Sequence, residues 1–306
     1  MRLPRLSLPR PRLSLDWIGA VADRTTLLYI GYTSALFIVF LIVTFPHEML
    51  IRRALSTVNR GPVGVQFSSA NFAWWHGYEL SGMRVASADE DGKPPYVEFS
   101  HLWVRPTLGA LLRGNPYALT LSADLYGGSA NGDMNLTDGN FVGVLQLQDL
   151  NLGRYRTLTA LIDEGQVSGK MSGQLNFEVH GANFNTGQLT GDLTLEGAAL
   201  TAAKVNGFGI PDVHLRQIKS KFIVRGGRLE IQEFNATGDV NVQGSGQVVL
   251  RDPPGESTLN LRATFLPTPQ TSDALKGALM LIPRPPGTKP DAPVTIIGTP
   301  LRPKFR

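Results

Sequence analysis

The stretch "TGDVNVQGSGQVVL" (residues 237–250) contains two copies of a short pattern that decides the fold class of this chain. Each copy has Ser, Thr or Asn, then Gly, then Asp or Gln, with apolar residues at its fourth and sixth positions. Further copies begin at residues 131 ("NGDMNL"), 172 ("SGQLNF") and 190 ("TGDLTL"). Because alternate residues of a strand face opposite sides of a sheet, this pattern predicts strands with one apolar face.

The spacing of the copies predicts how these strands are connected. Successive copies begin 41, 18, 47 and 8 residues apart, which is too irregular for a strict solenoid. The glycine suits a bulge or a bend, and its polar neighbours suit a turn or the solvent face. We therefore expect a serial meander of hairpins that forms an extended, curved, antiparallel-rich β-sheet with one apolar face.

The rest of the chain also indicates a mainly β fold with few short helices. Period-2 alternation is clear at residues 119–125, 218–224 and 259–265. Helix is predicted at 272–281, with Ser272 as its N-cap, and a proline-rich connector (282–292) precedes a last strand. The turn signals between strands are Asp91-Gly92, Asn131-Gly132, Asp138-Gly139 and Gly226-Gly227.

The N-terminal part contains an apolar segment of membrane-spanning length. Residues 25–46, "TTLLYIGYTSALFIVFLIVTFP", are 22 residues without a charge. A helix of that length spans roughly 33 Å, close to the thickness of the hydrocarbon core of a bilayer. The alternative is a cleaved signal peptide, but no small-residue cleavage site follows. A single transmembrane helix is therefore expected, anchored by Leu27, Leu28, Tyr29, Tyr32, Leu36, Phe37, Phe40 and Phe45.

The charges on either side of this segment predict its orientation. Residues 1–24 contain five arginines in a proline-rich tail, and the other side offers Arg52, Arg53 and Arg60. The positive-inside rule then places the tail in the cytoplasm and the β-rich domain (61–306) in the periplasm of a bacterium, with the helix in the inner membrane. In residues 47–60, apolar residues share one helical face. This pattern predicts an amphipathic helix that lies on the membrane surface or caps the following domain.

Composition excludes several classes of function. From residue 47 onward, 24 basic residues face 23 acidic ones, so no basic surface is expected to bind nucleic acid. The chain has no cysteine, which excludes disulfides and thiolate metal sites.

No candidate catalytic motif in the sequence is complete. His47-Glu48 lacks the second histidine of a zinc-protease motif, because Ile51 stands in its place. "GQVSGKM" (165–171) is too short for a phosphate-binding loop, and "GGSAN" (127–131) lacks the second glycine of a nucleophile elbow. The five histidines are scattered without ligand spacing. We expect a non-enzymatic protein without a catalytic residue, metal or cofactor.

An aromatic cluster follows the first predicted strand. In "NFAWWHGYEL" (71–80), Phe72 and Trp74 share one face, Gly77 breaks the run, and Tyr78 and Leu80 share a face after it. This order predicts a hairpin corner. The patch Phe72, Trp74, Trp75 and Tyr78 then fills the core, contacts lipid headgroups, or forms a pocket on which a ligand stacks.

The order of these features resembles that of AsmA-like proteins, and most of all the type II secretion system protein N (GspN) family. The similar stretches are "VGVQFSSANFAWWHGYELSGMRV", "VRPTLGALLRGNPYALTLSADLYGG", "LQDLNLGRYRTLTALIDEGQVSGKMSGQLNF" and "APVTIIGTPLRPKF", spread over residues 45–306. These motifs are structural rather than catalytic. The basic tail before the apolar segment is not part of the resemblance.

The resemblance implies two functions from different classes. One is an accessory or scaffold component of a type II secretion system, with the other secretion components as partners. The other is lipid binding or transfer, because AsmA-like proteins resemble troughs with an apolar inner face that holds phospholipid. In this chain that apolar groove would be lined by Leu193, Leu195, Val240, Val242, Leu259 and Leu261. The alternative for the same residues is a core packed against a second layer.

Overall fold

The computed structural model describes residues 24–44, 48–49, 51–53, 63–73, 77–87, 96–107, 110, 118–137, 140–155, 164–180, 187–205, 208–251, 254–283, 292–300 and 302–306. The chain divides into two compact units, Met1–Met49 and Leu50–Arg306.

The first unit contains helix α2 (Arg24–Thr44), which coincides with most of the predicted apolar segment. The side chains described in it are exposed, and they include Leu28, Tyr29, Tyr32, Leu36, Phe37 and Phe40. Leu27 (by its side chain) and Phe45 lie outside the described residues, as does the predicted tail up to residue 23. Judged over the described residues alone, no helix is long and apolar enough to cross a membrane.

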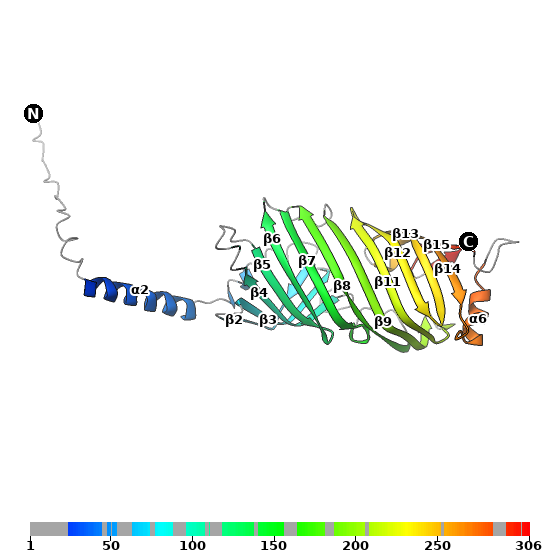
Figure 1. Ribbon diagram of the computed structural model, residues 1–306, viewed down its shortest axis with the longest axis horizontal. Helices are drawn as coiled ribbons and strands as arrows, with labels where there is room; N and C mark the ends of the chain where they lie inside the picture. Colours follow the sequence, from blue (N-terminus) through cyan, green and yellow to red (C-terminus); the bar gives the residue numbers. More distant parts are fainter. Residues whose placement is uncertain are drawn as a thin grey trace, which may run out of the picture. The chain divides into compact units, whose positions relative to one another are not determined.

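The second unit is one large antiparallel β-sheet, which confirms the predicted mainly β fold with few helices (Figure 1). Its first strands are β1 (Val63–Gln66), β2 (Ser69–Ala73), β3 (Gly77–Ser87), β4 (Tyr96–Pro106), β5 (Ala118–Leu125), β6 (Gly128–Thr137), β7 (Asn140–Asn151), β8 (Glu164–His180) and β9 (Gln188–Val205). The remaining strands are β10 (Phe208–Gly209), β11 (Val213–Arg225), β12 (Arg228–Gly238), β13 (Val240–Val249), β14 (Thr258–Pro267), β15 (Val294–Thr299) and β16 (Arg302–Phe305).

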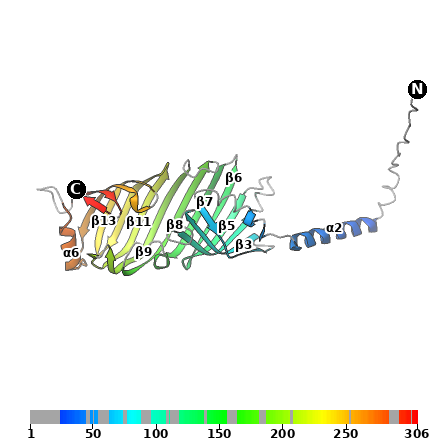
Figure 2. The same ribbon diagram turned by 180° about the vertical axis from the view of Figure 1, so that it is seen from behind.

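Strand order in the sheet follows strand order in the sequence, as the predicted meander requires. From β3 to β16 each strand pairs with its neighbours in the chain, except that β10 pairs only with β9, so that β11 lies directly beside β9. Strands β1 and β2 both pair with β3 at one edge, and β16 forms the other edge. The sheet is therefore open, and Figures 1 and 2 show that it is long and strongly twisted.

Short helices lie at the ends of strands. A 3-10 turn (Leu152–Arg154) follows β7, and another (Pro254–Glu256) precedes β14. Helix α6 (Asp273–Met280) confirms the predicted helix at 272–281, and the Ser272 side chain accepts a hydrogen bond from the Leu275 amide, as an N-cap does. Of the predicted connector 282–292, residues 284–291 lie outside the described residues.

One turn prediction is correct and another is wrong. Gly226 and Gly227 connect β11 to β12, and both have positive φ angles (56° and 70°), which glycine adopts without steric cost. Asn131-Gly132 instead lies in the middle of β6, paired with β5 and β7 on either side. The actual β5–β6 turn is Tyr126-Gly127, where Tyr126 adopts a φ of 51°. Asp91-Gly92 and Asp138-Gly139 lie outside the described residues.

One cluster of buried side chains lies in β5 to β7. It consists of Ala123, Leu125, Ala130, Leu147 and Leu150, and half-buried side chains such as Phe99, Leu102, Met171 and Leu193 pack against it. Part of the predicted helix at 47–60 is helical (48–49 and 51–53). Its Arg52 guanidinium lies 4.5 Å from the centroid of the Phe67 ring, a contact of the kind that a helix capping the domain would make.

Candidate functional site: the apolar face of the sheet

The register of the strands creates an unusually long row of apolar positions on one face of the sheet. We call this the apolar row. Its members, each paired with the next across adjacent strands from β3 to β16, are Tyr78, Val104, Leu121, Gly132, Leu145, Leu175, Gly191, Phe222, Ile231, Gly246, Leu261, Ile296 and Phe305. All are half-buried except Gly191, which is buried.

The repeated sequence pattern is the cause of this row. Its second, fourth and sixth positions share one face of a strand, so the glycine and the two apolar residues all point to the same side. Gly132, Gly191 and Gly246, the glycines of three copies, lie in the row between large apolar side chains. At Gly191 the Phe222 ring occupies the space of the missing side chain, since a Cβ built on Gly191 would lie 2.3 Å from Phe222 Cζ.

The predicted bulge or bend is confirmed on one side of the glycine in the copies of β8 and β13. The register shifts between Leu147 and Leu150 of β7, where Leu147 pairs with Gly173, and between Ile231 and Phe234 of β12, where Ile231 pairs with Gly246. Pairing between β13 and β14 runs through Gly246 without a shift, and β8 pairs with β9 continuously from Lys170 to Glu178, past Gly173. The shifted stretch of β7 includes Asp149, whose φ is 54°. Each of these two glycines therefore lies between one neighbouring strand that shifts register and another that approaches closely without a shift.

The structure places the predicted groove residues on this same apolar face. Leu261 belongs to the apolar row, and Leu193, Leu195, Val242 and Leu259 lie in rows beside it, opposite Gly173, Met171, Phe265 and Val248 respectively. Val240 pairs with Pro267 and is buried, whereas the other five are half-buried.

Within the paired positions of β8 to β15, this face presents no charged side chain. The strand faces here consist of Leu, Ile, Val, Phe, Met, Ala, Gly and Pro, with Ser220 of β11 as the polar exception. A small hollow of about 260 Å³ opens on it, lined by residues that include Ile231, Phe234, Val242, Leu261, Phe265 and Ile296. That volume is below the range of pockets that enclose a whole small molecule, and it suits a section of a hydrocarbon chain.

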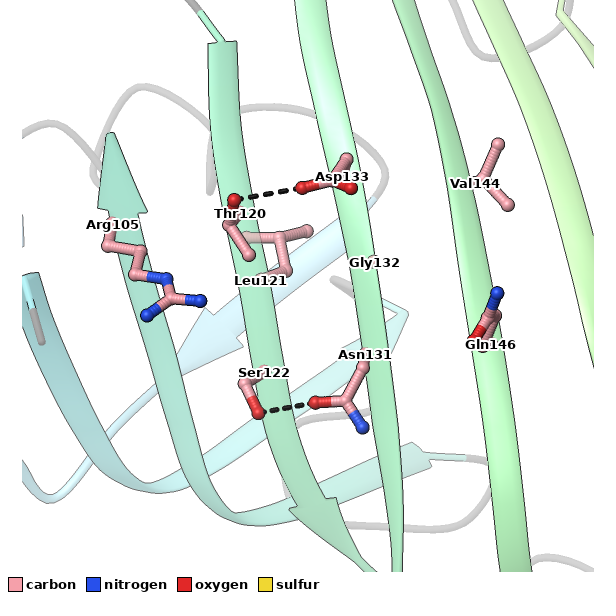
Figure 3. Close-up of a pocket in the computed structure, with 9 residues that line it drawn as sticks. All are labelled: Arg105, Thr120, Leu121, Ser122, Asn131, Gly132, Asp133, Val144 and Gln146. Carbon is pink, nitrogen blue, oxygen red and sulfur yellow. Dashed lines mark hydrogen bonds between the residues drawn. The ribbon is translucent and has the colours of Figure 1, made fainter. Parts of the chain in front are cut away.

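The opposite face is polar, and a hollow of about 270 Å³ lies on it between β4 and β7. Figure 3 shows the residues that line it. Ser122 Oγ donates to Asn131 Oδ1 (2.6 Å), and Thr120 Oγ1 donates to Asp133 Oδ1 (2.8 Å). Arg105 and Gln146 complete its polar lining, and no histidine lines it. The two hydroxyls are thus bonded to side-chain acceptors across the strands, which stabilises the sheet as cross-strand polar pairs do.

The described histidines do not form a catalytic relay. His101 Nδ1 lies 3.0 Å from Glu79 Oε1 and 3.5 Å from Ser81 Oγ, so both partners meet the same nitrogen. A relay of the serine-hydrolase kind requires one partner at each ring nitrogen. His180 pairs with Glu178 and His214 with Asp239, on other strands; His47 and His76 lie outside the described residues. Across the described part of the chain, no group of three His, Asp or Glu side chains is placed to hold a metal ion.

The aromatic patch is only partly described. Strands β2 and β3 form the predicted hairpin, in which Phe72 pairs with Tyr78 and their ring centroids lie 5.1 Å apart. Tyr78 begins the apolar row. Trp74 and Trp75 lie outside the described residues.

Sequence reasoning missed two features of this unit. The first is the length of the apolar row, which depends on the register of thirteen strands. The repeated sequence pattern was the feature from which this row could have been predicted. The second is an exposed apolar end of α6, where Met280 and Leu281 are each 83% exposed.

Comparison with known proteins adds no relative: no protein-family model matches the chain, and no curated protein or solved structure does either. The similarity to type II secretion protein N and AsmA-like proteins therefore stays a prediction from the sequence.

Proposed function

We propose that this protein binds the acyl chains of lipids on the apolar face of its sheet, as an AsmA-like lipid-binding or lipid-transfer protein of the bacterial envelope. The observation that carries the proposal is the apolar row, an uncharged path of half-buried positions across thirteen strands. Monomeric proteins seldom leave contiguous apolar surface of more than a few hundred Å² in water. Burying such surface is favourable by roughly 25 cal/mol per Å².

The chemistry of this face favours hydrocarbon over a polar ligand. A polar ligand needs donors and acceptors at fixed positions, and Ser220 alone offers one between β8 and β15 in the paired positions. A lipid tail needs only contact, and the path allows it to lie across many strands. The headgroup would remain in water, outside the apolar face.

The proposal includes anchoring of the chain in the inner membrane by residues 25–46, with the sheet in the periplasm. Its support is the sequence, which has 22 uncharged residues there, with five arginines in residues 1–24 against three in residues 47–60. An anchor would keep the sheet beside a bilayer that supplies its lipid. The proposed activity is non-enzymatic and requires no cofactor.

A second candidate function, an accessory role in a type II secretion system, is favoured by the strands at the two ends of the described sheet. Strand β1 stands first and β16 last in the sheet order, and terminal strands are where a sheet can accept further strands. Strand β16 is the less suitable edge, because Arg302, Pro303 and Lys304 oppose strand addition. Affinity capture from native membranes tests this candidate, and recovery without any secretion component counts against it.

Lipid binding is tested by native mass spectrometry of the gently extracted full chain and two variants. Leu261→Asp places a carboxylate in the apolar row, whereas Asn260→Asp places one on the exposed polar face of the same strand. We expect phospholipid on the wild-type protein and on Asn260→Asp, and about tenfold less on Leu261→Asp, because a charge does not enter a hydrocarbon contact without a large desolvation cost. A wild-type chain free of lipid, or equal lipid on both variants, would overturn the proposal.

A further inference from the structure

The C-terminal end of α6 is the most exposed apolar feature described in the second unit. We call Leu279, Met280, Leu281 and Ile282 the α6 tip. Met280 and Leu281 are each 83% exposed, against 46% for Val142, 42% for Leu250 and 41% for Val249 on the sheet. With Pro267 and Pro283 the tip forms a largely apolar hollow of about 530 Å³. A single exposed apolar side chain is ordinary on a protein surface. Adjacent exposed apolar side chains that form an apolar hollow indicate a contact site.

The base of α6 is held firmly against the sheet, so the tip is presented in a fixed position. Thr268 Oγ1 donates to the carbonyl oxygens of Gly238 (3.1 Å) and Asp239 (2.9 Å), and Thr271 Oγ1 donates to Asp239 O. Leu275, one turn into the helix, is buried. Hydrogen bonds thus hold the segment before α6 against the β12–β13 turn. The last turn of α6 is exposed to solvent.

We propose that the α6 tip inserts into the surface of a lipid bilayer. Residues 277–282, "GALMLI", carry no charge, and Lys276 lies one turn before the exposed pair. Lysine at this distance can reach phosphate groups while its neighbours enter the acyl region. The Lys276 ammonium pairs with Asp273 on the surface (3.0 Å), where it is open to water.

The backbone at the tip is compatible with an apolar surrounding. The amides of Leu281 and Ile282 donate to the carbonyl oxygens of Ala278 (3.2 Å) and Leu279 (3.4 Å). Internal bonds of this kind remove polar groups that would otherwise oppose entry into lipid.

Continuity with the apolar face also favours a bilayer as the occupant. Val240 and Pro267 are paired on the same side as Val242 and Phe265, and Pro267 lines the hollow of the tip. The apolar face therefore leads to the hollow of the tip, which Lys276 also lines. This part of the inference rests on the proposed function: a lipid that moves along the face would leave it where the tip meets a bilayer.

The absence of cysteine gives a direct test with the full chain. Met280→Cys, labelled with an environment-sensitive fluorophore, is reconstituted into vesicles and mixed with a second vesicle population of the same phospholipids. A quencher lipid is placed in one population at a time. Gln247→Cys, on the exposed polar face of β13, is the matched control. We expect quenching of the label at 280, about fivefold or more above that at 247, and the population that quenches identifies the bilayer that is contacted.

Equal quenching at both positions would overturn the inference. A second variant, Leu281→Ser with Met280→Ser, separates it from the proposed function. We expect this variant, reconstituted in the same way, to tether about tenfold less of the second vesicle population, while it keeps its bound phospholipid. Vesicle contact that is unchanged in the double variant would equally refute insertion by the tip. Loss of lipid together with contact would assign these side chains to the lipid-binding face and would also overturn the inference.

Discussion

Replacing Gly246 by alanine is expected to destabilise the folded sheet by about 3 kcal/mol or more. A Cβ at this position would lie 2.4 Å from the carbonyl oxygen of Asn260 and 2.7 Å from Leu261 Cα, both in the backbone of β14. Gly246 also has a φ of 147°, which side chains rarely adopt. The neighbouring strand must therefore move, and the local ladder between β13 and β14 must weaken. Chemical denaturation followed by far-ultraviolet circular dichroism measures the effect.

Gly244→Ala is the matched control for this change. Gly244 lies two residues earlier on the same face of the same strand, and its nearest neighbour for a new Cβ is Arg262 O at 3.3 Å. We expect Gly244→Ala to change the free energy of unfolding by less than about 1 kcal/mol. If both variants lose the same stability, the close backbone approach at Gly246 is not the reason for its glycine.

A second large effect is expected at the start of β15. Val294 is 1% exposed and pairs with Ala263, so Val294→Asp buries a carboxylate among apolar groups. We expect a loss of about 4 kcal/mol, enough to release β15 and β16 from the edge of the sheet. Limited proteolysis should then cut between α6 and β15, and thermal unfolding should begin at lower temperature.

Thr295→Asp provides the comparison, because Thr295 is half-buried and lies on the opposite face of the same strand, across from Arg262. A carboxylate there can be solvated, so we expect a change below about 1 kcal/mol. Equal proteolysis of the two variants would show that the C-terminal edge does not depend on burial of Val294.

The sequence predicted the strands whose two faces differ most. Leu119, Leu121, Ala123 and Leu125 alternate in β5, and Ile218, Phe222 and Val224 share one face of β11, as period 2 requires. The groove residues were found for the same reason, since each follows a glycine of the pattern or lies in an alternating run. Local alternation is a property of a few residues, so it is visible without the fold.

Other features could not be predicted because they depend on neighbours that are distant in sequence. Asn131-Gly132 has the composition of a hairpin turn, yet the β5 and β7 partners on either side hold it in an extended ladder. The role of Gly191 is visible only once Phe222, 31 residues later, lies over it. The exposure of Met280 and Leu281 likewise depends on where the sheet ends, because an amphipathic pattern alone would place such residues against a core.

The pairing of each strand with its sequence neighbours makes the width of the sheet an adjustable quantity. Adding or removing a complete hairpin the size of β12–β13 keeps the direction of every later strand, so the path along the apolar row only becomes longer or shorter. A single added strand would reverse all that follow it. The length of the apolar row can therefore change in steps of two strands, by duplication of one short gene segment, while the fold stays the same.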